Sequence, residues 1–217
     1  MIEVRGVHHH YGATMALEDV TLRVPRGAVV GLVGPNGAGK TTLVRAIGTL
    51  LHHSSGVIRV AGHDTRTHPE RVRRQLGYLP ERASPYPELL AWEHLDLFAR
   101  IAGHTGIERS RRVDASLEAA GLRDRRDTPN AALSKGLRQR LALQTVLLHD
   151  PVAIVLDEPT DGLDPDSRAG LLATARSLAD AGVAVLLSNH VLQELEEVAD
   201  EVVILSMGRV RQEAEPP

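Results

Sequence analysis

The sequence predicts an α/β fold: a mainly parallel sheet with flanking helices, a small antiparallel β-subdomain and an inserted helical subdomain. Near-continuous apolar segments at 28–33, 152–156 and 183–187 are typical of parallel strands that are covered on both faces. A glycine-rich loop joins the first of these segments to an amphipathic helix. Between about residues 83 and 149 strand patterns give way to helical spacing, which indicates a helical insertion into the α/β core.

Length and composition exclude several classes of protein. The 217 residues fit one domain with a sizeable core. A net charge of −3 and an aromatic content of 2% argue against a nucleic-acid-binding surface. The absence of cysteine excludes disulfides and thiolate metal sites. The N-terminus lacks the apolar region of a signal peptide, and no apolar run reaches the ~18 residues that span a bilayer. We therefore expect a soluble chain that meets a membrane only through a partner.

The glycine-rich loop fits the pattern G-x-x-x-x-G-K-[ST]. Its residues are Gly34, Pro35, Asn36, Gly37, Ala38, Gly39, Lys40 and Thr41. Between a strand and a helix, such a loop wraps backbone N–H groups around phosphate, the lysine reaches the β- and γ-phosphates, and the hydroxyl binds Mg²⁺. Of the 25 lysine and arginine residues only Lys40 and Lys135 are lysines, and a compact ammonium suits a phosphate cradle. The alternative, a glycine-rich turn with an unrelated lysine, does not explain this context.

Before this loop, apolar and polar residues alternate loosely, as they do in strands. Two strands of an antiparallel edge sheet are expected at 2–7 and 17–24. Between them, His8-His9-His10-Tyr11-Gly12 suggests either a metal site or a solvated loop. Consecutive extended residues point to opposite faces, which is poor chelating geometry, so we favour the loop.

Apolar spacing predicts that the helix after the glycine-rich loop includes Leu43, Ile47, Leu50 and Leu51. A strand at 57–61, a short basic helix at 69–75 and a strand at 76–80 are expected to follow.

The helical insertion is expected to contain helices at about 89–102 and 108–120. The arginine-rich segments 109–112 and 123–126 are interleaved with acids, so solvated helix faces are expected there rather than nucleic-acid contacts. Ser134 is well placed to cap the N-terminus of the next helix.

Acidic residues follow the second apolar strand. Asp157 and Glu158 stand at its carboxyl end, the edge where open parallel sheets bind ligands. Asp157 can hold Mg²⁺ and Glu158 can face an attacking water, although exposed acids after a strand are common. His190 follows the strand at 183–187 at the same edge, so a γ-phosphate contact is favoured over a structural role. A helix is expected at about 166–179, a strand at 202–205, and a frayed tail at 213–217.

With these segments in order, the chain resembles the nucleotide-binding subunit of ATP-binding cassette (ABC) transporters over essentially its whole length. Residues 34–41 are similar to Walker A, 133–140 to the signature segment, 152–158 to Walker B with its catalytic glutamate, and 161–164 to the D-loop. The resemblance implies a P-loop NTPase (RecA-like) fold. Within a single domain, 1–82 and 150–217 would form the ATP-binding core and 83–149 the helical subdomain.

The resemblance also implies site residues. Those expected to bind ATP are Tyr11, which would stack on adenine, Gly34, Pro35, Asn36, Gly37, Ala38, Gly39, Lys40, Thr41, Thr42, Ser134, Lys135, Gly136 and Asp164. Those expected to bind Mg²⁺ are Thr41, Asp157 and Glu81, and those expected to take part in hydrolysis are Glu158, His190, Lys40 and Glu81.

Two departures from the family pattern stand out. Lys135 and Leu137 replace a glycine and the glutamine of the usual Leu-Ser-Gly-Gly-Gln signature, and Glu81 replaces the usual glutamine after the strand at 76–80. A carboxylate at that position adds negative charge near the γ-phosphate. The segments around Glu81 and Lys135 resemble exporter-type cassettes of the ABC-2 group.

The family's partners follow from the same resemblance. Its members dimerise head to tail, with an identical or a different cassette, and ATP lies between Walker A of one subunit and the signature helix of the other. An integral-membrane permease would hold the chain at the cytoplasmic face of the membrane, and 81–92 is expected to form part of the groove that receives it. No nucleic-acid partner is expected. The alternatives are a soluble, non-transport ABC ATPase and a regulatory cassette with little turnover.

Overall fold

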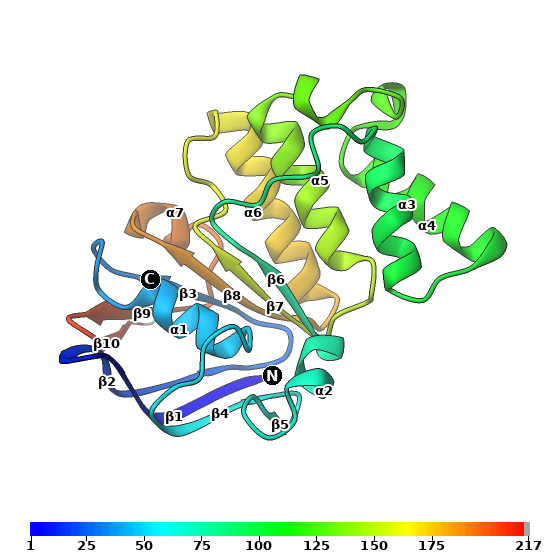
Figure 1. Ribbon diagram of the computed structural model, residues 1–217. Coiled ribbons are helices and arrows are strands. Elements are labelled where there is room, and N and C mark those ends of the chain that lie inside the picture. The colour runs from blue at the N-terminus through cyan, green and yellow to red at the C-terminus, as the bar shows by residue number, and fades with distance from the viewer. Residues whose placement is uncertain (215–217) are drawn as a thin grey trace. The chain divides into compact units, whose positions relative to one another are not determined.

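The computed structural model describes residues 1–214 (Figure 1). The chain divides into two compact units. The first consists of Met1–Tyr78, Pro151–Pro159 and the chain from Leu172 onward, and the second of Leu79–Asp150 and Thr160–Leu171. The subdomain boundaries expected from the sequence stay a prediction.

Two sheets form the framework of the first unit. The antiparallel sheet has the order β2-β1-β4-β5, and the larger one the order β10-β9-β3-β8-β7-β6. Their strands are β1 (Ile2–Tyr11), β2 (Thr14–Val24), β3 (Val29–Val33), β4 (Ser55–Val60), β5 (His63–Asp64), β6 (Leu76–Leu79), β7 (Ala153–Asp157), β8 (Ala184–Asn189), β9 (Glu201–Ser206) and β10 (Arg209–Ala214). β3 pairs in parallel with both β8 and β9, and β7 with β8. The three apolar segments predicted as strands are thus present, and β3, β7 and β8 are buried at every residue.

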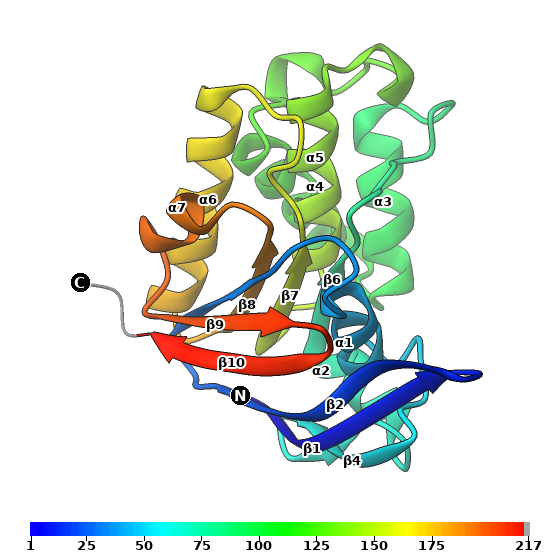
Figure 2. The same cartoon turned by 90° about the vertical axis from the view of Figure 1, so that its left-hand side faces the viewer.

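The core of the first unit joins the two sheets through helix α1 (Lys40–Ile47). Leu43, Val44 and Ile47 of α1 are fully buried with residues from both sheets. The short helices α2 (Pro69–Gln75) and α7 (Leu192–Glu196) belong to the same unit, and β10 runs alongside β2 (Figure 2). A buried apolar framework therefore supports the loops at the carboxyl ends of β3, β7 and β8.

The second unit is helical. It contains α3 (Ala91–Ile101), α4 (Gly106–Ala119), α5 (Lys135–Leu147) and the 3₁₀ turns η1 (Arg123–Arg125) and η2 (Asn130–Ala132), and α6 (Pro165–Asp180) begins in it. Leu95, Leu117 and Leu141 are fully buried in its core, where α3, α4 and α5 meet. The described chain has no strand between β6 and β7, as the sequence predicted.

The structure corrects two expectations near the N-terminus. The segment from His8 to Tyr11 is not a loop, because it completes β1 and pairs with β2 up to Tyr11 opposite Thr14, with Gly12 at the turn. Backbone pairing with β2 and β4 thus continues through the histidines, and the expected solvated loop is wrong. The helix after the glycine-rich loop ends at Ile47: the N–H of Gly48 bonds to Val44, and Thr49 takes a φ of 60°. Leu50 is consequently 63% exposed and does not extend the apolar face.

At the C-terminus the expected frayed tail is wrong for residues 213 and 214, which belong to β10. There Glu213 pairs with Val203 and Ala214 with Val202. The remainder of the expected tail, 215–217, lies outside the described residues. β10 extends to Ala214 because β9 offers its edge for hydrogen bonding. Local composition did not reveal this pairing.

Candidate functional site

The glycine-rich loop lies between β2 and the end of β9. A Cβ atom on Gly34 would lie 2.2 Å from the backbone oxygen of Leu205, and one on Gly39 would lie 2.6 Å from that of Ala16. Gly39 also has a φ of 107°, which side chains other than hydrogen strongly disfavour. Glycine is therefore required here by close packing, and the loop leads directly into the N-terminus of α1. The first-turn N–H groups of α1 have no partner within the helix, so the loop provides donors for an anion.

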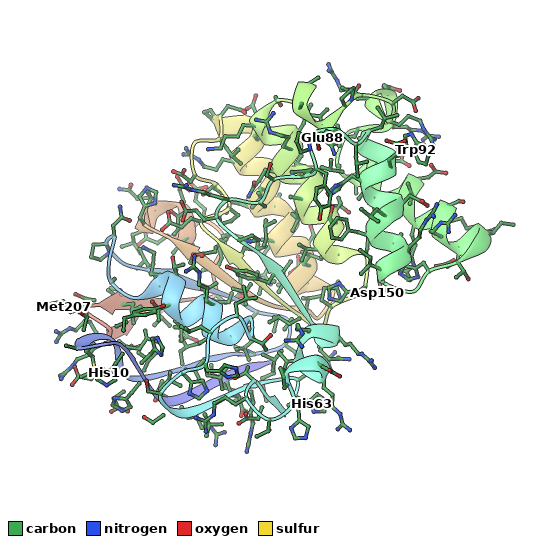
Figure 3. The ribbon with its side chains drawn as sticks, in the orientation of Figure 1. His10, His63, Glu88, Trp92, Asp150 and Met207 are labelled. Atoms are coloured by element: carbon green, nitrogen blue, oxygen red, sulfur yellow. The ribbon has the colours of Figure 1, made fainter. Side chains whose placement is uncertain are left out.

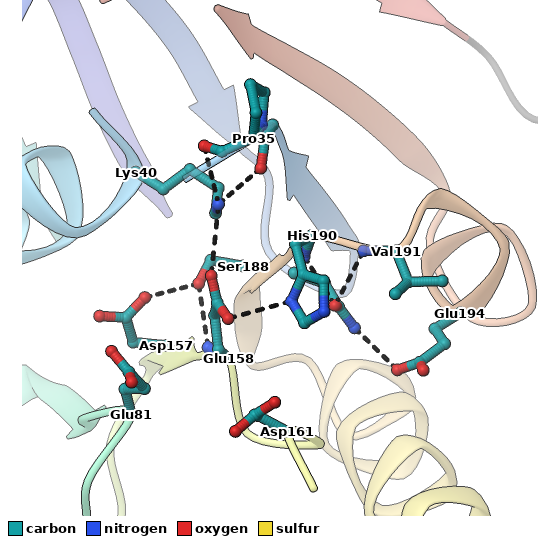
Figure 4. Close-up of polar contacts among 12 residues, drawn as sticks. Pro35, Lys40, Glu81, Asp157, Glu158, Asp161, Ser188, His190, Val191 and Glu194 are labelled. Carbon is teal, nitrogen blue, oxygen red and sulfur yellow. Dashed lines mark hydrogen bonds and ion pairs between the residues drawn. The ribbon is translucent and has the colours of Figure 1, made fainter. Parts of the chain in front are cut away.

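Lys40 is the first residue of α1, and its side chain is 4% exposed. Its Nζ donates hydrogen bonds to the backbone oxygens of Gly34 (2.6 Å) and Pro35 (3.5 Å). The same ammonium lies 3.2 Å from Oε1 of Glu158. The lysine thus spans the loop and reaches the carboxyl end of β7 (Figure 4).

Asp157 and Glu158 occupy that end of β7. Asp157 is 1% exposed and accepts a 2.6 Å hydrogen bond from Oγ of Ser188 on β8. The N–H of Glu158 donates to the same Oγ at 3.0 Å, and Glu158 has a φ of 45°. A positive φ is incompatible with extended backbone, so β7 ends at Asp157. The side chain of Glu158 lies between Lys40 and His190 (Figure 4).

His190 follows β8 and lies with its Nδ1 3.1 Å from Oε2 of Glu158. The turn that carries it is held by Asn189, whose Oδ1 accepts hydrogen bonds from the N–H groups of His190 (2.7 Å) and Val191 (3.0 Å). Nδ2 of Asn189 donates to Glu194 at 2.8 Å. Glu158 therefore bridges two candidate residues that stand 150 positions apart in the sequence, Lys40 and His190.

These residues are chemically suited to a nucleoside triphosphate with Mg²⁺. Asp157 offers a buried carboxylate and Thr41 a hydroxyl, both hard oxygen ligands of the kind that Mg²⁺ prefers. The backbone donors of the loop and the Lys40 ammonium are suited to phosphate oxygens. Glu158 is a carboxylate that can accept a proton from water.

Tyr11 is the last residue of β1 and is 50% exposed. The neighbouring residues of β2 contact the glycine-rich loop, since Gly39 approaches both Ala16 and Leu17. Tyr11 lies opposite Thr14 in the same hairpin. An exposed aromatic ring thus stands in the strand pair that packs on the loop.

In the second unit, the expected cap of α5 is confirmed, since Oγ of Ser134 accepts a 3.3 Å hydrogen bond from the N–H of Leu137. Nζ of Lys135 lies 3.9 Å from Oδ2 of Asp161. Asp164, expected at the nucleotide, accepts a 2.9 Å hydrogen bond from the N–H of Ser167 at the start of α6. The hydroxyl and the N–H of Ser167 both lower the pKa of the Asp164 carboxyl.

Glu81 belongs to the second unit and is exposed, with its Oε1 3.8 Å from Nε of Arg82. Most positions from Arg82 to Glu88 are exposed too, including Tyr86 at 53%. The functional roles assigned to Glu81, Asp164 and the other candidate residues stay predictions.

Sequence reasoning gave no role to Ser188 or Asn189. Ser188 links Asp157 to the backbone of Glu158, and Asn189 shapes the turn before His190. Both are polar and almost fully buried at the end of an otherwise apolar strand. A polar residue in that position, at the ligand-binding edge of a parallel sheet, was the available signal.

Comparison with known proteins identifies relatives of the whole chain. The family described as ABC transporter matches residues 17–161. The daunorubicin resistance ATP-binding protein DrrA3 of Streptomyces coeruleorubidus is 42% identical over 210 residues, covering 96% of this chain and 66% of the relative. The Nod factor export ATP-binding protein I of Ralstonia nicotianae is 34% identical over 216 residues, covering 100% and 67%. This chain therefore spans about two thirds of the length of these relatives.

Solved structures of ABC transporter subunits are similar to this chain as well. The structure of an ATP-binding subunit of an ABC transporter has a TM-score of 0.89 and 37% identity, covering 99% of this chain and 90% of that one. A dimeric bacterial ABC transporter cassette has a TM-score of 0.89 and 25% identity, covering 100% and 99%. Within residues 1–214, no helix is both long and apolar enough to cross a membrane. The predicted P-loop NTPase fold is confirmed, and the chain belongs to the ABC transporter family, whose ATPase domain it carries.

Proposed function

We propose that this chain binds and hydrolyses ATP to power a separate membrane permease, in the direction of export. The observation that carries the proposal is the position of Glu158, which lies 3.2 Å from Lys40 and 3.1 Å from His190 at the ligand-binding edge of the sheet. The names of relatives, daunorubicin resistance and Nod factor export, support the exporter assignment.

In this proposal the residues of the first unit divide the chemistry among themselves. The loop N–H groups and Lys40 bind the phosphates, and Glu158 accepts the proton of the attacking water. His190 stabilises charge that develops on the transferred phosphoryl group. Bound Mg²⁺, held by Thr41 and Asp157, would supply further neutralisation of phosphate charge, and Ser188 keeps the Asp157 carboxylate in place.

The residues of the second unit act across a dimer. Ser134, Lys135 and Gly136 form the N-terminus of α5, which presents backbone N–H groups and an ammonium to an anion. Their proposed ligand is the γ-phosphate bound to another cassette, identical or different. ATP then joins two cassettes, and hydrolysis releases them. The similarity to a dimeric cassette supports this arrangement.

The permease is proposed to dock on the segment from Glu81 to Trp92, which is exposed at most positions up to Glu88. This docking would hold the chain at the cytoplasmic face of the membrane. Crosslinking from exposed positions such as Glu88 (Figure 3) tests the surface, and crosslinks that never capture a membrane subunit would argue against it.

Two substitutions test the hydrolytic proposal. Glu158→Gln should bind ATP, accumulate as a dimer and turn over at least about 100-fold more slowly, because an amide cannot accept the proton. Lys40→Ala should lose ATP binding itself. Glu197→Gln, an exposed carboxylate in the first unit, is the matched control and should retain wild-type kcat. Full steady-state turnover by the Glu158→Gln protein would overturn the assignment of the base.

A further inference from the structure

The histidine run at the end of β1 contains a buried side chain, His9, to which the site described above gives no role. His9 is 6% exposed, whereas His10, its neighbour on the opposite face of the strand, is exposed at the surface (Figure 3). Among the described residues, neither ring nitrogen of His9 has a hydrogen-bond partner. An imidazole without polar partners is an expensive choice for a buried position, where an aliphatic side chain carries no such penalty.

The principal directional contact of His9 is with Tyr11. The two rings are 4.6 Å apart between centroids and stand at 84° to each other, an edge-to-face arrangement. Residues two apart on a strand share a face, so β1 itself brings the two rings together. His9 is buried and Tyr11 is half exposed, so the pair has one anchored ring and one ring open to a ligand.

The pair is connected to the phosphate-binding loop through β2. His9 lies opposite Leu17 and Tyr11 opposite Thr14. Leu17 and its neighbour Ala16 are the residues that Gly39 approaches, at 3.0 Å and 2.6 Å from the position of a Cβ atom. The open Tyr11 ring is thus fixed in register with the loop that would hold the phosphates.

We propose that His9 is a positioning residue for the nucleobase: its edge-to-face contact holds the Tyr11 ring, so that the open part of this ring is presented in one orientation to the purine of a nucleoside triphosphate. The inference rests on the proposed function, because it requires that ATP occupies the loop. Its specific content is that His9 acts through Tyr11 and on the base alone. The requirement is for a ring at position 9, since edge-to-face packing needs two rings.

Two probes test the proposal: ATP, and inorganic tripolyphosphate. Tripolyphosphate carries the phosphates without a base. Calorimetric titration of the full chain should show His9→Leu binding ATP about 3- to 10-fold more weakly, the range expected from loss of one aromatic pair. Binding of tripolyphosphate should not change. His9→Phe should restore ATP binding to within about 2-fold of wild type, because it keeps a ring against Tyr11. His10→Ala, on the opposite face of β1, is the matched control.

A double substitution separates action through Tyr11 from direct action. Tyr11→Ala should weaken ATP binding, and adding His9→Leu to it should cause no further loss. Additive losses, equal loss of tripolyphosphate binding, or a His9→Phe protein as weak as His9→Leu would overturn the positioning role. Failure of the proposed function is distinguishable, because the wild-type chain would then bind neither probe.

Discussion

Gly136 and Ser167 are in such close contact that a Cβ atom on Gly136 would lie 2.3 Å from Oγ and 2.9 Å from Cβ of Ser167. Both residues belong to the second unit, one in the first turn of α5 and the other in the first turn of α6. Ser167 also donates its N–H to Asp164. The glycine of the signature segment is therefore required by its own chain, in addition to any phosphate that approaches it from another cassette.

We expect Gly136→Ala to destabilise the protein by about 1–3 kcal/mol, as overpacking of a close contact does. Combining it with Ser167→Gly removes both clashing atoms and should recover packing at α5, leaving the loss of about 1 kcal/mol that glycine causes in a helix. Urea unfolding and ATP-dependent dimerisation should both be measured. Gly170→Ala in α6, where a Cβ atom meets open space, is the control and should be neutral or stabilising. If the double variant unfolds as easily as Gly136→Ala, the contact with Ser167 is not the cause.

Ser188→Ala should lower kcat by about 10-fold while changing ATP affinity little. The Ser188 hydroxyl donates to Asp157 at 2.6 Å and accepts the N–H of Glu158 at 3.0 Å, so its loss removes one hydrogen bond of roughly 1 kcal/mol on each side. Steady-state hydrolysis with calorimetric ATP titration separates the two effects. Ser177→Ala on the exposed face of α6 is a suitable control. A purely weaker ATP affinity with unchanged kcat would contradict this positioning role.

Lys135→Ala should weaken ATP-driven dimerisation by a few-fold and leave thermal stability unchanged. The ammonium lies 3.9 Å from Asp161, but both side chains are more than half exposed, and pairs of this kind contribute at most about 1 kcal/mol. Its proposed partner is instead the γ-phosphate at another cassette. Analytical ultracentrifugation of the Glu158→Gln background with ATP measures the effect, which should diminish at high salt. An equal loss of melting temperature would indicate an intrachain role.

Acid should destabilise the helical unit through His94. Burial lowers the pKa of His94 to about 4, and the ring packs against Phe98 and Tyr86 with centroid distances of 4.9 and 5.8 Å. In the unfolded chain this pKa is near 6.5, so between pH 6.5 and 4 only the unfolded state binds the proton and stability falls as pH falls. Below about pH 4 both states are protonated and this contribution no longer changes.

His94→Phe should therefore reduce the loss of unfolding free energy between pH 6.5 and 4 by up to about 3 kcal/mol. Denaturant unfolding at a series of pH values measures it. His52→Gln, an exposed histidine, should leave the slope unchanged. Some slope should remain in either variant, because burial also lowers the pKa of His53. A slope identical to wild type in the His94→Phe protein would rule out this account.

Local sequence signals were sufficient where a segment carries its own structural information. Helix α2 has the predicted limits because Pro69 begins it and the strand residues of β6 follow at once. Ser134 caps α5 as its side-chain chemistry predicts. The phosphate-loop motif was recognisable because its glycines, Lys40 and the flanking apolar strand occur together.

The remaining features depend on partners that are distant in the sequence. β10 needs the edge of β9, and β1 continues through three histidines because β4 pairs with His8 and β2 with His9 and His10. The bond between Ser188 and Asp157 joins residues 31 positions apart, and local composition marks Ser188 as polar without identifying its partner. Periodicity could therefore place the candidate acids at one sheet edge but could not show which neighbours hold them there.

The two carbonyl groups that bind the Lys40 ammonium have a further consequence. The ammonium contacts Glu158 as well, so the loop contains its own cation, around which its two carbonyl groups gather. In the proposed function, an incoming phosphate would replace a single ion contact, that between Lys40 and Glu158, while the two carbonyl contacts stay within the loop.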